Sequence, residues 1–375
     1  LQESFFWIHD ENRNSDIHFG LQDVKIENIR PFVHKNAEPM RSDPYIPEIA
    51  PETGKTVCVV GGGPAGMTAA FYLRQRGHQI TVLEAMPHAG GMLRYGIPEY
   101  RLPKQIVQRE IDTITAMGGI DIRYGVRVGK DVTLEELKAK YDAVIVAIGA
   151  WKSTAMRCPG EELEGVLGGI DFLRDAIEGR DTGIGKKVVV VGAGNTAMDA
   201  ARAAKRVDGV ETVSIVYRRD IANMPADLDE LEAAMAEGVL FEPLLSPVTL
   251  ENGSLECEVM KLGAPDASGR RKPEPTGEIQ SVVCDSVIAS LGEKVDSEFY
   301  ASLGVSLDER GLPVNTETVK FIGNGATGAK TVVEAIASAQ KAVTELCGAD
   351  YSKYKSLCSE YTGLSKRAVL NPKFK

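Results

Sequence analysis

The sequence contains no apolar run of the length that a membrane-spanning helix requires. A candidate such as Val188 to Val191 is only as long as a β-strand, whereas a span needs roughly 18 apolar residues. The first residues lack a basic segment followed by an apolar core, so they do not indicate a secretory signal. They also lack a Met, which is compatible with a piece of a longer polypeptide. We expect a cytoplasmic protein without a membrane span.

Paired cysteines and an excess of basic residues are also lacking. The six cysteines include no C-x-x-C pair, and their spacing fits neither a zinc site nor an iron–sulfur site. We expect reduced thiols, with Cys58 and Cys284 in buried strands, and therefore no metal and no redox-active disulfide on this chain. The net charge of −10 argues against nucleic acid, because phosphate contacts need clustered Lys and Arg.

The 375 residues, of which 43% are apolar and 26% charged, allow two or three globular domains. Residues 1–50 show little periodicity and several prolines, which predicts an extension that wraps a neighbour or another subunit. Residues 263–277 are rich in Pro, Gly and charge, which indicates a surface hairpin, and the sequon at Asn252 indicates a turn.

A glycine-rich turn opens the ordered part of the sequence. A strand predicted over Thr56–Val60 leads into the turn, a helix over Met67–Arg76 follows it, and a second strand covers Gln79–Leu83. Strand, turn, helix and strand together predict a parallel, right-handed βαβ unit. The acid Glu84 comes directly after the second strand, where ribose hydroxyls of a dinucleotide can donate to it.

Three glycines in this turn have separate roles. Gly61 lets the chain leave the strand, Gly63 lets the backbone approach a pyrophosphate, and Gly66 lets the helix pack closely on the strand. The N–H groups at the start of the helix then point at the phosphates. The pattern predicts a dinucleotide site.

The same pattern recurs in a second predicted unit. A strand over Lys187–Val191 is followed by a turn from Gly192, a helix over Met198–Arg206 and a strand over Val213–Tyr217. The third glycine is replaced by Ala197, so we expect a slightly wider gap between helix and strand.

An arginine pair follows the second strand of this unit. Arg218 and Arg219 stand where a site selective for NAD would carry an acid, and a guanidinium can bind a 2′-phosphate through two hydrogen bonds. We therefore favour NADPH, although the pair does not exclude NADH. Residues 142–149 also resemble residues 285–292, and each stretch is predicted to be a strand that ends in Gly.

Several motifs together resemble one family. They are Val59–Gly66, Gly90–Pro98 with Arg101-Leu102-Pro103, Val191–Asp199, Val216–Arg219 with Met224-Pro225, and Gly323–Gly325 leading into Thr331–Ile336. From about residue 55 to 343 the chain resembles the small subunit of glutamate synthase and its relatives. These include the flavin–NADPH module of dihydropyrimidine dehydrogenase and the large subunit of NADH-dependent ferredoxin:NADP oxidoreductase.

The resemblance implies an α/β fold of two Rossmann-like nucleotide-binding domains. The expected domains are an N-terminal extension (1–53), an FAD-binding domain in two parts (54–150 and 292–347), an inserted NAD(P)H-binding domain (151–291) and a C-terminal tail (348–375). The insertion makes a hinge motion between the two domains an expectation. In the family, Gly91 to Arg101 line the flavin, Arg101 contacts FAD, and the helix near Thr331 points its N-terminus at the pyrimidine side of the flavin.

The cofactor-binding candidates follow from the motifs and the resemblance. For FAD they are Gly61, Gly63, Pro64, Ala65, Gly66, Glu84, Ala85, Gly91, Met92, Leu93, Tyr95, Arg101, Val128, Ala147, Gly149, Gly323, Asn324, Thr331 and Val332. For NADPH or NADH they are Gly192, Ala193, Gly194, Asn195, Thr196, Asp199, Arg218 and Arg219.

The chain departs from the family at two places. Relatives usually carry Asp where this chain has Asn324, whose amide carbonyl can still accept from a ribityl hydroxyl. Relatives also carry iron–sulfur cysteines in an N-terminal domain, and residues 1–57 contain none. We therefore expect no iron–sulfur cluster on this chain. Such clusters must lie on a partner subunit or on a missing part of the polypeptide, or electrons leave the flavin for other redox centres.

Hydride transfer from nicotinamide to flavin needs no general base, so we name no catalytic residue. We expect the two histidines His78 and His88 to lie at the surface. The resemblance implies an electron-transfer subunit of a larger oxidoreductase. One alternative is a scaffold or relay flavoprotein subunit. Another is a self-contained dehydrogenase similar to the flavin disulfide reductases, although the paired cysteines of a thioredoxin-reductase-like enzyme are absent.

Overall fold

A computed structural model describes residues 46–348, except 252 and 266–270. Most of the expected extension, the tail from residue 349, Cys358 and the predicted turn at Asn252 lie outside these described residues. The described chain forms two compact units. Unit 1 contains the residues up to Gly90, Gln108–Gly149 and the residues from Ser297, and unit 2 contains Gly91–Val107 and Ala150–Asp296.

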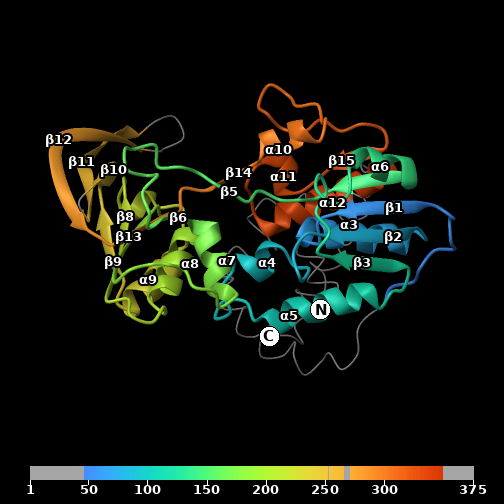
Figure 1. Cartoon of the computed structure of the whole chain (residues 1–375), viewed down its shortest axis with the longest axis horizontal. Coiled ribbons are helices and arrows are strands. Elements are labelled where there is room, and N and C mark those ends of the chain that lie inside the picture. The colour runs from blue at the N-terminus through green and yellow to red at the C-terminus, as the bar shows by residue number, and fades with distance from the viewer. Residues whose placement is uncertain (1–45, 252, 266–270, 349–375) are drawn as a thin grey trace, which may run out of the picture. The chain divides into compact units, whose positions relative to one another are not determined.

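Unit 1 is built on a parallel sheet in the order β15-β4-β1-β2-β3. Helices α3 and α12 pack against each other beside this sheet (Figure 1). Its elements are β1 (Thr56–Val60), α3 (Pro64–Gln75), β2 (Gln79–Glu84), β3 (Ile120–Tyr124), α6 (Leu134–Lys140), β4 (Ala143–Val146), α10 (Ser297–Ser302), β15 (Val319–Phe321), α11 (Asn324–Thr327) and α12 (Val332–Leu346). Helix α5 (Lys104–Thr115) crosses the boundary between the units.

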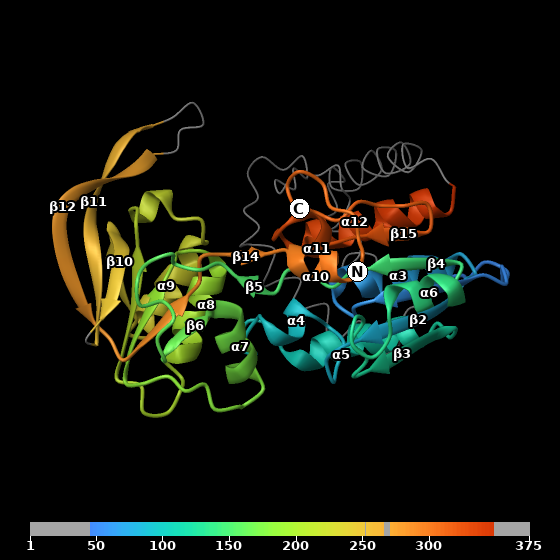
Figure 2. The ribbon, with the colours of Figure 1, turned by 45° about the horizontal axis from the view of Figure 1, so that its top comes forward.

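Unit 2 combines a parallel sheet, in the order β6-β13-β7-β8-β9, with an antiparallel sheet, β10-β11-β12 (Figure 2). Its elements are α4 (Met92–Tyr95), β5 (Lys152–Ser153), β6 (Val166–Gly168), α7 (Gly169–Ile177), β7 (Lys187–Val191), α8 (Asn195–Ala204), β8 (Thr212–Tyr217), η1 (Ile221–Asn223), α9 (Leu228–Ala236), β9 (Leu240–Pro243), β10 (Leu245–Glu251), β11 (Ser254–Pro265), β12 (Arg271–Val283), β13 (Ser286–Ala289) and β14 (Glu293–Lys294).

Alternate residues of β7 show how the parallel sheet of unit 2 is covered. Val188 and Val190 belong to the core that includes the buried residues of α8, whereas Val189 and Val191 pack in a second core with residues of β11 such as Leu255. Successive side chains of a strand point to opposite faces. Helices therefore cover one face of this sheet, and the antiparallel sheet covers the other.

The two parallel sheets share one arrangement around their first strands. Strand β4 lies beside β1, and β13 lies beside β7. An Asp precedes each of these strands: Asp142 accepts from the N–H of Thr56 at 2.8 Å, and Asp285 accepts from the N–H of Lys187 at 2.9 Å. The internal similarity expected from the sequence is therefore a structural equivalence.

The predicted elements around both turns are confirmed, with shifted ends. Strands β1 and β7 cover the predicted residues, while helices α3 and α8 each begin three residues earlier than predicted, at Pro64 and Asn195. Pro is favoured in the first turn of a helix, where its missing N–H costs nothing. The hairpin predicted over residues 263–277 is part of a longer one, because β11 pairs with β12, while residues 266–270 lie outside the described residues.

Segment 91–107 is grouped differently from the sequence-based division. That division placed the segment in the first part of the FAD domain, whereas its described contacts place it in unit 2. Within unit 2, α4 packs against α7, and Arg101 forms ion pairs with residues of α8 and α9, which are described below.

Candidate nucleotide-binding sites

The first glycine-rich turn is closely packed against its own unit. Gly61 has φ of +103°, and a Cβ on it would lie 2.5 Å from the carbonyl oxygen of Ala147. A Cβ on Gly66 would lie 1.8 Å from the carbonyl oxygen of Gly61. The protein itself therefore requires glycine at both positions. Ala147, an FAD-binding candidate by sequence, lies at this turn.

The N-terminus of α3 has no side-chain cap. Its N-cap is Gly63, with extended backbone, and Pro64 is the first helical residue. The N-termini of α6 and α12, in contrast, carry full capping boxes based on Thr133 and Thr331. An uncapped helix start keeps N–H donors available for an anion, which the helix dipole also favours.

Glu84 is buried at the end of β2 beside this turn. Its two carboxylate oxygens accept from the N–H groups of Gly62 and Met86, both at 2.7 Å. Burial raises the pKa of Glu84, and the backbone N–H donors oppose that shift. A carboxylate has about four lone-pair sites, so Glu84 can accept a further hydrogen bond from a ribose hydroxyl. Val128 is buried, and the N–H of Val126 donates to the carbonyl oxygen of Glu84 at 3.0 Å.

Asn324 has an unused acceptor. Its Nδ2 donates to the carbonyl oxygen of Lys330 at 2.9 Å, which fixes the amide, and its buried Oδ1 has no hydrogen-bond partner among the described residues. An unpaired buried acceptor is costly. A ribityl hydroxyl is a donor that would satisfy it, so this position fits FAD.

Further FAD candidates lie close to the same turn. Gly323 has φ of +66°, and a Cβ on it would lie 2.8 Å from the Cβ of Ala65. A Cβ on Gly325 would lie 3.0 Å from the carbonyl oxygen of Gly149. The structure thus brings the segments at the ends of β1, β4 and β15 together. Ala85 is half-buried next to Glu84.

Helix α12 begins where the resemblance implies, but its first turn is partly occupied. Thr331 is the N-cap and Val332 the first helical residue. The Glu334 carboxylate accepts from the N–H of Thr331 at 3.0 Å, and this bond helps to hold the pKa of Glu334 below its usual range. The capping box uses the N–H of Glu334, so the N–H groups of Val332 and Val333 are the first-turn donors without an intrahelical acceptor.

The second glycine-rich turn differs from the first in one important position. Gly192 has φ of +133°, and its Cβ would lie 2.2 Å from the carbonyl oxygen of Ser290. Gly194, the uncapped N-cap of α8, has φ of −88° and open space around a built Cβ. No described residue therefore requires glycine at 194, and a closely approaching ligand would account for it.

The neighbouring residues of this turn have specific partners. Ala193 is buried, and its carbonyl oxygen accepts from Ala226 at 3.1 Å. Asn195 accepts from the N–H of Asp227 at 3.2 Å, and the Thr196 hydroxyl donates to Glu293 at 3.3 Å. These contacts fix the first turn of α8.

The two arginines after β8 have different environments. Arg218 is exposed. Arg219 is 8% exposed, and its Nε donates to the carbonyl oxygen of Arg271 at 3.1 Å, which links the end of β8 to β12. Arg218 is therefore the arginine whose whole guanidinium is available to a phosphate.

The flavin-facing candidates on segment 91–107 pack within unit 2. Gly91, with φ of +51°, precedes α4. Met92 packs against the helix-side core, and buried Tyr95 has its ring centroid 6.4 Å from that of Trp151. Leu93 is half-buried.

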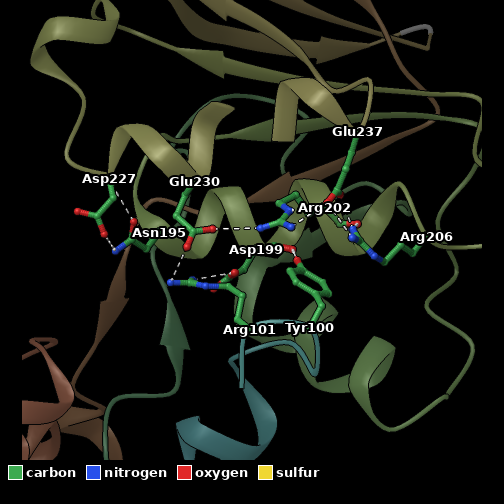
Figure 3. Close-up of polar contacts among 9 residues, drawn as sticks. All are labelled: Tyr100, Arg101, Asn195, Asp199, Arg202, Arg206, Asp227, Glu230 and Glu237. Carbon is green, nitrogen blue, oxygen red and sulfur yellow. Dashed lines mark hydrogen bonds and ion pairs between the residues drawn. The ribbon is translucent and has the colours of Figure 1, made fainter. Parts of the chain in front are cut away.

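Arg101 contacts carboxylates of unit 2 (Figure 3). Its NH1 lies 2.9 and 2.8 Å from the two carboxylate oxygens of Asp199, and its NH2 lies 3.1 Å from Glu230. Burial raises the pKa of Asp199 to about 6, against the opposing effect of Arg101. The Asp199 carboxylate, a cofactor-binding candidate by sequence, is thus engaged by Arg101.

Sequence reasoning missed the other members of this network. The Tyr100 ring lies 4.4 Å from the Arg202 guanidinium and 4.1 Å from that of Arg206. Arg202 forms ion pairs with Glu230 and Glu237. Residues 199, 202 and 206 are three and four positions apart, a spacing that places charges on one helix face and could have indicated the network.

The cysteines of the described residues are free thiols. Four are buried and Cys347 is half-buried. Burial raises the pKa of both Cys58 and Cys257 to about 12, so these thiols stay protonated at neutral pH. Within the described residues no group of His, Cys, Asp and Glu is arranged to hold a metal, and no helix is both long and apolar enough to cross a membrane.

The two histidines differ from each other. His88 is exposed as expected. His78 is half-buried, with its Nδ1 2.7 Å from the Thr53 hydroxyl and its Nε2 3.5 Å from the Cys347 sulfur. Its environment is therefore less open than the sequence suggested.

Comparison with known proteins places this geometry in a family. The model of the pyridine nucleotide-disulphide oxidoreductase family matches residues 55–344. The beta subunit of the NADPH-Fe(3+) oxidoreductase of Geobacter sulfurreducens is 45% identical over 304 residues, which are 78% of this chain and 43% of that protein. The chain thus spans less than half of that relative.

Two further comparisons cover more of the other protein. The glutamate synthase (NADPH) small chain of Escherichia coli is 34% identical over 349 residues, 85% of this chain and 73% of that one. The structure of Mycobacterium tuberculosis FprA in complex with NADPH matches with a TM-score of 0.68 at 21% identity, over 83% of this chain and 86% of that chain. The latter supports the fold.

Proposed function

Since this chain belongs to the pyridine nucleotide-disulphide oxidoreductase family, we propose that it binds FAD in unit 1 and NADPH in unit 2. We further propose that it passes electrons between NADPH and redox centres on a partner subunit. The observation that carries the proposal is the pair of equivalent glycine turns, each leading into a helix without a side-chain cap. One turn lies beside a buried acid, and the other beside an exposed arginine.

Unit 1 supports FAD through two unused acceptor positions. The Oδ1 of Asn324 has no partner among the described residues, and Glu84 can accept further hydrogen bonds at the end of β2. Bound FAD would supply an acceptor that takes two electrons from a nicotinamide and releases them singly. The chain's own residues would bind and orient both nucleotides and exclude water.

Unit 2 supports NADPH through Arg218. Its exposed guanidinium follows β8, at the position where dinucleotide folds distinguish a 2′-phosphate from a 2′-hydroxyl. Arg219 has its Nε engaged by the carbonyl oxygen of Arg271, so we assign it mainly to holding β12 against the end of β8.

A partner subunit is supported by the relatives. The Geobacter sulfurreducens relative is named as the beta subunit of an NADPH-Fe(3+) oxidoreductase, and the Escherichia coli relative as a small chain of glutamate synthase. We propose that iron–sulfur clusters lie outside this chain, on such a partner. The spacing of the cysteines supports this, since it fits no cluster motif.

An anaerobic titration tests the proposal. The visible spectrum of the purified chain is recorded, and NADPH and then NADH are added to the wild type, to R218A and to R310A. Arg310 is an exposed arginine of unit 1 and serves as the matched control. We expect a flavin spectrum that NADPH bleaches at lower concentration than NADH.

We expect R218A to raise the half-saturating NADPH concentration about ten- to a hundredfold, because a charge-assisted hydrogen bond contributes about 1.5–3 kcal/mol. The NADH value should stay within about twofold, and R310A should match the wild type. A bound flavin that neither nucleotide reduces would contradict the proposal and favour a scaffold or relay subunit. Turnover of a small molecule without any partner would favour a self-contained dehydrogenase.

A further inference from the structure

Segment 91–107 is held compact by one lysine. The ammonium group of Lys104 donates to the carbonyl oxygens of Leu93 at 3.0 Å, of Leu102 at 3.3 Å and of Ile97. Burial lowers the pKa of Lys104 to about 8. These bonds tie the end of α4 to the start of α5.

Arg101 links segment 91–107 to two helices of unit 2. Its NH1 bridges both oxygens of Asp199 on α8, and its NH2 reaches Glu230 on α9 (Figure 3). The Asp199 side chain is 6% exposed and that of Arg101 25% exposed. If the guanidinium left for another ligand, Asp199 would remain a buried carboxylate without its principal cation, which proteins avoid.

Tyr100 provides a second attachment to the same helix. Its ring lies against the guanidinium groups of Arg202 and Arg206, at 4.4 and 4.1 Å. Both guanidinium groups are held in turn by Glu237, whose pKa falls to about 2 mainly through its hydrogen bond with Arg206. Two adjacent residues thus engage α8 and the turn that follows it, by an ion pair and by cation–π contacts.

We propose that Arg101 is a positioning residue that, together with Asp199, fixes segment 91–107 to helix α8. Met92, Leu93 and Tyr95, which are FAD-binding candidates by sequence, belong to the segment that this pair holds within unit 2. Asp199 lies one helical turn after Asn195, the first residue of α8. Segment 91–107 is therefore attached to α8, the helix that begins at the second glycine-rich turn. The proposal rests on the proposed function only where it refers to flavin reduction.

Three variants and a control test the assignment in the full chain. R101M and D199N each remove one member of the pair, R101K keeps the charge but cannot bridge two carboxylates, and R109M changes an exposed arginine on α5. For each protein, deuterium exchange of the amides of residues 94–103, the FAD dissociation constant of the apoprotein and the rate of flavin reduction by NADPH are measured.

We expect R101M and D199N to act alike. Both should speed exchange in residues 94–103 by at least about tenfold, since exchange follows local opening, and both should slow flavin reduction by similar factors. The FAD dissociation constant should change less than about threefold. R101K should fall between wild type and R101M, and the double variant should be no worse than either single one, as expected for residues that act as a pair.

The opposite pattern overturns the assignment. Arg101 is an FAD ligand if R101M weakens FAD binding about tenfold or more while D199N leaves FAD binding and exchange unchanged. If R101M fails to fold, D199N and R101K still decide through exchange. If NADPH does not reduce the flavin of the wild type, the proposed function is wrong. The assignment of Arg101 is still tested in that case, because amide exchange and FAD binding do not depend on NADPH.

Discussion

The two glycine-rich turns share a backbone path but differ in what requires their glycines. In the first turn a Cβ on Gly66 would lie 1.8 Å from a backbone oxygen, whereas the second turn has buried Ala197 at the equivalent position. In the second turn Gly194 has open space around it. Gly66 is therefore fixed by the fold itself, whereas no described residue requires glycine at 194, and we propose that a ligand approaches there.

The buried acids of the two units show a second contrast. Glu84 lies at the end of a strand and is held by two backbone N–H groups. Asp199 lies inside a helix and is held by the guanidinium of Arg101. We propose that the first acid accepts from the hydroxyl groups of a ligand, whereas the second has its cation supplied by the chain.

The largest effect on stability is expected from exchanging glycine and alanine at the third glycine position of the two motifs. G66A should destabilise unit 1 by at least about 1–3 kcal/mol, because the methyl group meets a backbone oxygen that cannot move aside, and it should reduce the FAD content. A197G should cost about 1 kcal/mol, the helix propensity difference. Thermal unfolding and the flavin content of both variants are the measurements. Equal losses in both variants would show that the two motifs are packed alike.

Substitutions at two glycines of the second turn should distinguish an effect on folding from an effect on nucleotide binding. G192A places a Cβ 2.2 Å from the Ser290 carbonyl oxygen at a φ of +133°, and should lower the melting temperature by several degrees. G194A should leave the melting temperature unchanged within about 2 °C and weaken NADPH binding. Calorimetric unfolding and a nucleotide titration check this. A G194A protein that binds NADPH normally would remove the ligand-based account of Gly194.

The elements around the glycine motifs could be predicted from the sequence more fully than the roles of the charged residues. Strand, turn and helix follow from local apolar runs and glycine positions, so β1, β7, α3 and α8 were predictable. The partner of Arg101 was not, because Asp199 is 98 residues away and the resemblance had assigned both residues to cofactors. Arg218 and Arg219 are neighbours that only the fold separates into one exposed and one buried side chain.

A smaller effect should appear in the pH dependence of stability. The pKa of Asp199 is raised from its ordinary value near 3.8 to about 6, so the folded protein binds the proton more tightly than the unfolded chain. The Asp199 contribution to the free energy of unfolding should therefore decrease as pH rises between about 4 and 6, and level off above that.

Urea unfolding of wild type and D199N across this range gives the measurement. The free energy of unfolding of the wild type should rise relative to that of D199N as pH falls, because the side-chain amide at position 199 in D199N does not titrate in this range. The charged and titratable groups that act on Asp199 are Tyr100, Arg101 and Lys104 from segment 91–107, Arg202 on α8 and Glu230 on α9. A difference that does not vary between pH 4 and 6 would show that the pKa is not raised.

The sequence by itself determined that the chain carries two dinucleotide turns, one followed by an acid and one by arginines, because these patterns are local and each motif contains its own physical reason. Only the tertiary structure decided which polar groups remain available. Burial separated Arg218 from Arg219, and ion pairs joined segment 91–107 to α8. The side-chain oxygen of Asn324, whose Nδ2 donates to Lys330, has no partner among the described residues. Such outcomes depend on charges and hydrogen bonds between residues far apart in the chain, which no local pattern encodes.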